Sequence, residues 1–165
     1  VEISESNAVC RVIPSKKKFY NFQSIGEEQK RFKLCRIENK KILKTGCVQL
    51  EFHNGNNLLT KLPNVKESNA EEYSVLDTVK LSLDTDEILD HYKFNKEAYA
   101  IIMAGKNIGM HGIIAEVEPT KNKARKLRMV KLNGSDGRTY STIPDHFFII
   151  GKDKPVISLP EGANN

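Results

Sequence analysis

Two apolar runs separated by a glycine-marked turn occupy residues 99–117, and this stretch constrains the fold of the chain most strongly. The first run spans residues 99–103 and the second spans residues 113–117. The turn between them contains three glycines and three polar residues, which are Gly105, Gly109, Gly112, Lys106, Asn107 and His111. Because glycine adopts positive φ without steric cost and lets another backbone approach closely, the pattern predicts two strands of a small β-barrel. Lys106 and the glycine amides would then face outward, where they can contact a phosphate.

This stretch resembles a KOW motif, the strand–loop–strand unit of SH3-like barrels in ribosomal proteins and transcription elongation factors. Other segments narrow the resemblance to one family, the eukaryotic and archaeal form of small-subunit ribosomal protein number four. These segments are residues 27–37, 77–81, 92–94, 147–152 and 154–162. The resemblance covers nearly the whole chain. It identifies the chain as a divergent member without the RNA-binding region usual at the family's N-terminus.

The resemblance implies a structural constituent of the small ribosomal subunit that binds ribosomal RNA and supports translation. The implied partners are small-subunit ribosomal RNA and neighbouring ribosomal proteins, with no membrane, small-molecule substrate or cofactor. The implied location is the ribosome in the cytoplasm, with assembly in the nucleolus if the source is eukaryotic. Two alternatives stay open: a KOW module of a transcription elongation factor, and a protein-interaction adaptor that uses the acidic segment 66–90.

Alternation of apolar and polar residues predicts short strands along most of the chain. We therefore expect a mostly β protein in three parts. Residues 1–94 would form a β-rich central domain, residues 95–150 a KOW SH3-like barrel, and residues 151–165 an extended C-terminal tail.

Three local expectations follow from the pattern. Pro14 and Ser15 are expected to end a first hairpin, because proline interrupts strands. Residues 31–38 are expected to form a strand covered on both faces, followed by a basic loop with Lys40, Lys41 and Lys44. In the barrel, one strand is expected to be patterned by Leu127, Met129 and Leu132.

A lysine triplet at residues 16–18 precedes three aromatic residues, Phe19, Tyr20 and Phe22. One interpretation is a set of phosphate contacts beside a platform on which bases stack. The other is a solvated turn followed by a core strand, with Tyr20 and Phe22 on one face and Phe19 on the other. The second interpretation is favoured, because aromatic residues in strands usually pack inward.

The charge of the chain is distributed unevenly around a formal net charge of +5. Residues 11–44 carry eleven basic and three acidic residues, and residues 105–133 carry seven and two. Residues 66–90 instead carry two basic and eight acidic residues. Since Lys, Arg and backbone amides suffice to contact phosphates, the basic segments supply most of the predicted RNA-binding residues. The predicted set is Lys16, Lys17, Lys18, Lys30, Arg31, Lys33, Arg36, Lys40, Lys41, Lys44, Lys106, Asn107, His111, Lys121, Lys123, Arg125, Lys126 and Arg128.

No combination of residues in the sequence indicates an enzyme or a metal site. The four histidines form no HxH or HExxH pattern, and neither a Walker A loop nor a GxSxG motif is present. Asp84 and Asp86 lack the glycine and the distant glutamate of a calcium loop. The three cysteines include no CxxC pair, which fits a reduced intracellular protein. We therefore expect a binding protein rather than a catalyst.

Overall fold

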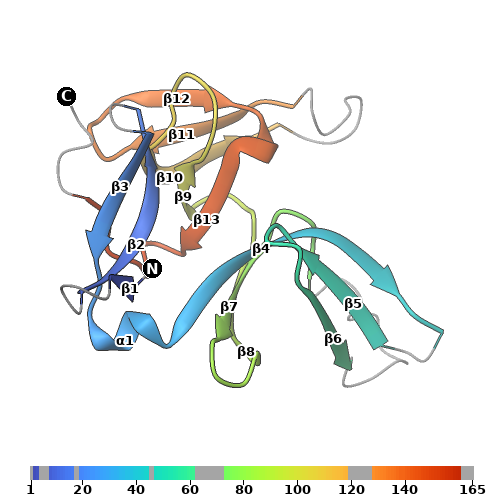
Figure 1. Ribbon diagram of the computed structural model, residues 1–165. Coiled ribbons are helices and arrows are strands. Elements are labelled where there is room, and N and C mark those ends of the chain that lie inside the picture. The colour runs from blue at the N-terminus through green and yellow to red at the C-terminus, as the bar shows by residue number, and fades with distance from the viewer. Residues whose placement is uncertain are drawn as a thin grey trace.

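The computed structural model describes residues 2–3, 8–16, 19–44, 47–61, 73–118 and 128–160 (Figure 1). Within these ranges the chain is mostly strand, with a single α-helical turn, α1 (Glu27–Lys30), and a single 3-10 turn, η4 (Pro144–His146). The strands form three sheets, and every pair of neighbouring strands is antiparallel. The mostly β fold that the alternation predicts is confirmed.

A five-stranded sheet curls into a half-barrel, drawn at the top of Figure 1, in the spatial order β12-β11-β10-β9-β13. Its strands are β9 (Tyr99–Ile102), β10 (His111–Val117), β11 (Val130–Gly134), β12 (Thr139–Thr142) and β13 (Phe147–Gly151). Its core contains Ile102, Ile114, Leu132 and Phe147, all almost fully buried. Among the described strands no ladder joins β12 to β13, so the expected small barrel is open there, and η4 connects the two edges.

A second five-stranded sheet has the order β6-β5-β4-β7-β8. Its strands are β4 (Phe32–Ile42), β5 (Cys47–Phe52), β6 (Asn57–Lys61), β7 (Thr78–Ser82) and β8 (Ile88–Tyr92). The long central strand β4 is covered on both faces, as its sequence predicts. Cys35 and Ile37 lie in a core with Leu50, whereas Phe32 packs in a different cluster with Phe148 of the half-barrel.

A third, smaller sheet has the order β1-β2-β3 and consists of β1 (Glu2–Ile3), β2 (Ala8–Ser15) and β3 (Phe19–Ser24). The prediction that Pro14 and Ser15 end the hairpin is wrong, because β2 continues through both residues and pairs them with Tyr20 and Phe19. β1 pairs with β2 only at Ala8 and Val9, so on that side of Pro14 β2 is an edge without a described neighbour. The N–H group that proline lacks is therefore not required for pairing with β1. Proline is tolerated at such an edge.

Two further expectations need correction. β11 begins at Val130, so Val130 and Leu132 are its fully buried residues, while Met129 is exposed. Period-two geometry cannot place both Met129 and Leu132 on one face, and burial selects the even-numbered residues. Lys40 and Lys41 lie on β4 rather than in a loop, because a register shift between Ile37 and Asn39 lets that strand bend and continue to Ile42.

The half-barrel and the second sheet pack against each other. Strand β13 contacts β4, β7 and β8. Tyr92, the last residue of β8, is buried in the half-barrel core, and Leu34 of β4 packs against the same core. The domain boundary expected at residues 94–95 stays a prediction, and it would divide a chain whose two sheets share apolar contacts.

Candidate nucleic-acid interface

The loop between β9 and β10 is a backbone-closed turn that depends on glycine at two positions. Gly105 and Gly109 have φ of 84° and 85°, values that residues with a side chain rarely adopt. The Gly109 N–H donates to the Ile102 carbonyl and the Ile102 N–H donates to the Met110 carbonyl, both at 2.8 Å. The Gly109 amide is therefore occupied within the turn, contrary to the expectation that it faces a phosphate.

Lys106 lies at the tip of this turn with an exposed side chain. It forms no ion pair with any residue in the described ranges. Asn107 is half-buried, and its carbonyl accepts a hydrogen bond from the Met110 N–H at 3.2 Å. The turn thus offers one cation to a ligand, and the neighbouring asparagine backbone helps to hold the loop.

His111 is a structural residue in this arrangement. Its Nδ1 lies 2.9 Å from the Tyr99 hydroxyl, and the two rings are stacked with centroids 6.0 Å apart. Burial lowers the pKa of His111 below its ordinary value, because the charged imidazolium is poorly solvated there. A neutral half-buried imidazole contributes little to phosphate binding, so the structure does not favour the role predicted for His111.

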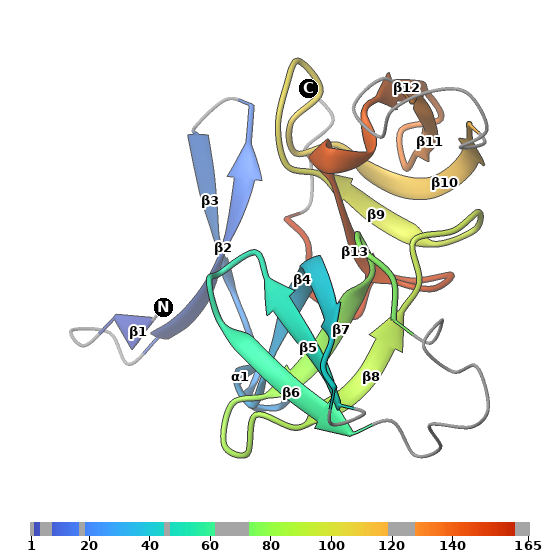
Figure 2. The same ribbon diagram turned by 90° about the vertical axis from the view of Figure 1, so that its right-hand side faces the viewer.

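The turn lies directly against the β2–β3 hairpin. A Cβ added at Gly109 would come within 2.9 Å of the Pro14 carbonyl oxygen and 3.4 Å of the Ser15 Cα. In both views the hairpin and the β9–β10 loop extend side by side in the same direction (Figures 1 and 2). Lys16 follows β2 directly, is exposed, and has no ion-pair partner within the described ranges. Two exposed cations, Lys16 and Lys106, therefore come from segments that touch.

The aromatic residues beside Lys16 are exposed, so the favoured prediction that they form a core strand is wrong. Phe19, Tyr20 and Phe22 expose 82%, 60% and 65% of their surface. The shared face of Tyr20 and Phe22 follows from strand geometry, but that face of the hairpin points to solvent. The inward face is the opposite one, where Ile13 is buried against Ile101 and Phe148.

Several predicted RNA-binding lysines are engaged within the protein. Lys33 Nζ lies 3.2 Å from Asp86 Oδ1, and Lys41 Nζ lies 2.7 Å from Glu51 Oε1. Lys30 pairs with Glu27 within α1. Lys40 donates to the Tyr73 carbonyl at 2.7 Å. A phosphate would have to compete with these partners, so such lysines are weaker candidates than Lys16 or Lys106.

Arg36 joins the second sheet to the half-barrel. Its Nη1 donates to the carbonyl of Asp145 at 2.8 Å and to that of Phe147 at 2.7 Å. Its Nε donates to Glu38 Oε1 at 2.9 Å. Only 15% of the side chain is exposed, so the guanidinium holds the second sheet to the half-barrel and has little accessible surface for RNA.

Some of the remaining predicted cations lie within the described residues and the others lie outside them. Arg31 and Lys44 are exposed, whereas Arg128, two residues before β11, is half-buried. The others lie outside the described residues, and they are Lys17, Lys18, Lys121, Lys123, Arg125 and Lys126.

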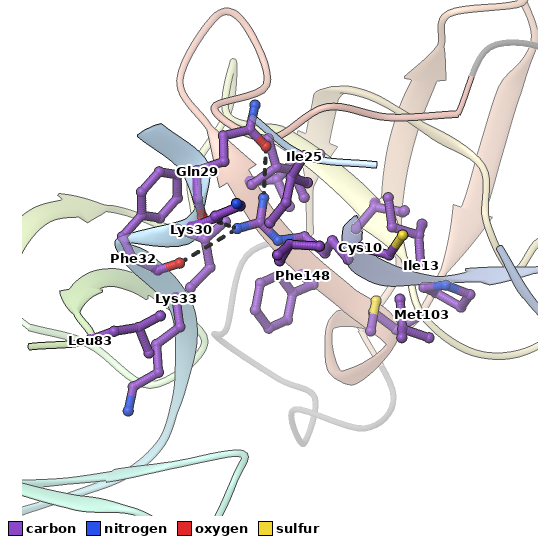
Figure 3. Close-up of a pocket in the computed structure, with 18 of the residues that line it drawn as sticks. Cys10, Ile13, Ile25, Gln29, Lys30, Phe32, Lys33, Leu83, Met103 and Phe148 are labelled. Atoms are coloured by element: carbon purple, nitrogen blue, oxygen red, sulfur yellow. Dashed lines mark hydrogen bonds between the residues drawn. The ribbon is translucent and has the colours of Figure 1, made fainter. Parts of the chain in front are cut away.

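Sequence reasoning missed an apolar cavity of about 430 Å³ beneath the hairpin (Figure 3). Ile13, Phe32 and Phe148 are among its lining residues, and they come from β2, β4 and β13. Arg11 closes one side by donating to Gln29 Oε1 at 3.1 Å, and burial lowers the pKa of its guanidinium. No local motif signals this cavity, because its walls come from segments more than a hundred residues apart in the chain.

The acidic segment supplies structural carboxylates as well as surface charge. Asp77 is buried, and its carboxylate accepts hydrogen bonds from the N–H groups of Ser74 at 2.9 Å and Phe94 at 2.8 Å. His91 Nε2 lies 2.8 Å from the same carboxylate. Within the described ranges, no group of three His, Cys, Asp or Glu side chains is arranged to hold a metal ion. In those same ranges no helix has the length and apolar character needed to cross a membrane.

The fold defines a mostly β protein in which a half-barrel packs on a second sheet. One exposed lysine, Lys106, lies at the glycine turn of the half-barrel, and another, Lys16, lies at the adjoining hairpin. The chain belongs to Ribosomal family S4e, whose sequence model matches residues 6–88.

Relatives support this assignment over almost the whole chain. The chain is 37% identical over 163 residues to small ribosomal subunit protein eS4 of Aeropyrum pernix and equally identical to that of Desulfurococcus amylolyticus. Each match covers 99% of this chain and 64% of the relative, so the chain spans less than two thirds of their length. The crystal structure of the 30S ribosomal protein S4e from Thermoplasma acidophilum has the same fold. It is 24% identical with a TM-score of 0.68, and the match covers 88% of this chain and 68% of that one.

Proposed function

We propose that the chain is part of a structural constituent of the small ribosomal subunit, where it binds ribosomal RNA and has no catalytic activity. Membership of Ribosomal family S4e is the observation that carries this proposal. It favours the ribosome over a transcription elongation factor, whose resemblance rests on the KOW stretch alone. Ribosomal RNA and neighbouring ribosomal proteins would be the partners, and the cytoplasmic ribosome the location.

The exposed cations at the hairpin and the turn support a role in RNA binding. Lys16 and Lys106 have no ion-pair partner in the described part of the chain, so a phosphate would displace no internal contact. Phosphate contacts supply much of the affinity for nucleic acid and position the protein without reading bases. RNA helices are recognised mainly by shape and backbone, which suits a rigid turn closed by its own backbone hydrogen bonds.

Co-sedimentation with small ribosomal subunits through a series of salt washes tests the proposal. We expect the protein to stay with the subunit at moderate salt and to leave only at high salt, because release of several phosphate contacts depends steeply on ionic strength. Its absence from the subunit fractions at low salt would contradict the proposal. Association that survives nuclease treatment would instead favour the adaptor alternative.

A binding titration against purified small-subunit RNA at several salt concentrations tests whether Lys16 and Lys106 contact phosphates. Replacing Lys16 and Lys106 together by Gln should lower the slope of log affinity against log salt by about two, one for each phosphate contact. Lys131→Gln is the matched control, because Lys131 already pairs with Glu116 at 2.8 Å. Equal slopes for the double variant and the control would remove Lys16 and Lys106 from the interface.

A further inference from the structure

We infer that the outward face of the β2–β3 hairpin is a stacking site for unpaired nucleotides of RNA. This inference deepens the proposed function and rests on it. Tyr20 and Phe22 would stack on bases, while Lys16 and Lys106 would contact the flanking phosphates. The site lies beside the glycine turn and is distinct from the paired lysines of the second sheet.

Strand register places four apolar side chains on the outward face. Val12 is opposite Phe22 and Pro14 is opposite Tyr20, and side chains two residues apart share a face. Tyr20 and Phe22 are therefore neighbours along β3, about 7 Å apart. Both residues are more than half exposed, and Val12 beside them is 39% exposed. We expect exposed aromatic rings that are grouped on a two-stranded ribbon to form a binding site, because large exposed apolar patches on proteins usually mark interaction surfaces.

The charge around the aromatic face indicates a polyanion. The described part of the hairpin, residues 8–16 and 19–24, includes two basic residues, Arg11 and Lys16, and no acidic residue. Residues 103–110 of the adjoining turn include Lys106 and likewise no acidic residue. A peptide partner would need apolar groups together with a matching excess of acidic residues. Single-stranded RNA offers negative phosphates and flat apolar bases in alternation, which is the combination that positively charged aromatic surfaces bind.

The backbone at the start of β3, next to this face, adopts an unusual conformation. Phe19 has φ of 59°, a left-handed conformation that a residue with a large side chain rarely adopts. The residue is 82% exposed, so burial in the protein does not compensate for the strain. Strained residues tend to gather where they serve binding or catalysis. The register pairs Phe19 with Ser15 and places it on the face opposite Tyr20 and Phe22, so Phe19 lies at the hairpin tip beside the stacking surface and is not part of it.

Base stacking can be measured with a single-stranded uridine-rich RNA of about 12 nucleotides that carries one 2-aminopurine. The 165-residue chain is titrated into this probe, and both its fluorescence anisotropy and the 2-aminopurine intensity are recorded. Stacking of the probe base on an aromatic ring should quench the intensity as the complex forms. Phe22→Leu and Tyr20→Leu remove a ring and keep an apolar side chain, so each should weaken binding about tenfold and reduce the quenching.

Leu59→Ala is the matched control, because Leu59 is 64% exposed on β6 in the second sheet. It should leave affinity and quenching unchanged. Thermal unfolding followed by circular dichroism checks that all three variants fold like the unsubstituted protein. If folded Phe22→Leu and Tyr20→Leu bind and quench as the unsubstituted protein does, the stacking site is wrong and the proposed RNA binding stands. If the unsubstituted protein does not bind this RNA, the stacking site is equally refuted. Absence from the small subunit in the co-sedimentation experiment is the separate result that would refute the proposed function.

Discussion

At Gly112 the side chain is excluded by a neighbouring strand. A Cβ at this position would lie 2.0 Å from the Asn133 carbonyl oxygen and 2.8 Å from the Gly134 Cα. β10 and β11 would therefore have to separate to accept an alanine. We expect Gly112→Ala to lower the free energy of unfolding by about 1–3 kcal/mol, the usual cost of overpacking. Urea denaturation followed by circular dichroism measures this change.

Gly26→Ala is the matched control for Gly112→Ala. A Cβ at Gly26 meets nothing within 4 Å, and its φ of −74° is ordinary for alanine. The free energy of unfolding should change by less than about 0.5 kcal/mol, as for other surface substitutions. Similar losses for the two variants would mean that the close approach at Gly112 is relieved by a small shift of β11.

Residue types in the sequence predict which side chains can contact RNA, but they do not predict which of them are occupied. Lys33 and Lys106 are equivalent in local sequence terms, since each is a lysine in a basic segment. Lys33 pairs with Asp86, which is 53 residues away along the chain, and only the fold brings the two together. Lys106 protrudes from a turn whose glycines were recognisable in advance. The turn was therefore predictable from sequence, whereas the selection among cations required the tertiary structure.

At the scale of elements, strand periodicity predicted the faces of the hairpin and failed on which face is covered. Alternation correctly placed Tyr20 and Phe22 on one side of β3. It could not show that Ile13 supplies the inward face, because the covering residues Ile101 and Phe148 come from β9 and β13. In the half-barrel, β9, β10, β11 and β12 each lie next to a strand adjacent in the sequence, and alternation predicted strands there, although it chose the wrong inward residues for β11. Local patterns thus succeed where packing partners are near in sequence.

Arg36 on β4 carries a prediction about how two elements are joined. Two of its hydrogen bonds reach the carbonyls of Asp145 and Phe147 at the junction of η4 and β13. We expect Arg36→Met to lower the free energy of unfolding by about 2–4 kcal/mol, because hydrogen bonds to a charged group are lost and partly buried carbonyls lose their donor. Denaturant titration gives the value. Arg36→Lys should lose less free energy of unfolding than Arg36→Met, because lysine keeps the positive charge. The loss should still be measurable, because lysine cannot reproduce the planar array of donors of the guanidinium.

Lys41→Met provides the comparison for Arg36→Met. Lys41 pairs with Glu51 on the same sheet, and more than half of the lysine side chain is exposed. Exposed ion pairs contribute little, so the free energy of unfolding should change by less than about 1 kcal/mol. If Arg36→Met were no more destabilising than Lys41→Met, the Arg36 guanidinium would not join the two sheets, and it would again be a candidate for RNA binding.

For the whole molecule, the sequence predicts two domains divided at residues 94–95, and the packing allows a direct test of that division. Tyr92 of one sheet is buried in the core of the other, and Phe32 and Phe148 share a cluster across them. Single domains of this size usually unfold in one cooperative transition, whereas weakly joined domains unfold separately. We expect one transition, because separating the sheets would expose Tyr92 and Phe148 to water.

Matched substitutions in the two cores distinguish these cases. Leu50 lies in the second sheet and Leu132 in the half-barrel, and both are fully buried. Replacing either by Ala should cost about 2–5 kcal/mol. In a cooperative chain each substitution moves the single midpoint seen by circular dichroism, and it raises hydrogen exchange in both sheets. In a two-domain chain, Leu50→Ala would lower one midpoint, leave exchange in β9–β13 unchanged, and so support the division at residues 94–95. The shared burial of Tyr92 favours the first outcome, because loss of either sheet removes part of the core on which the other depends.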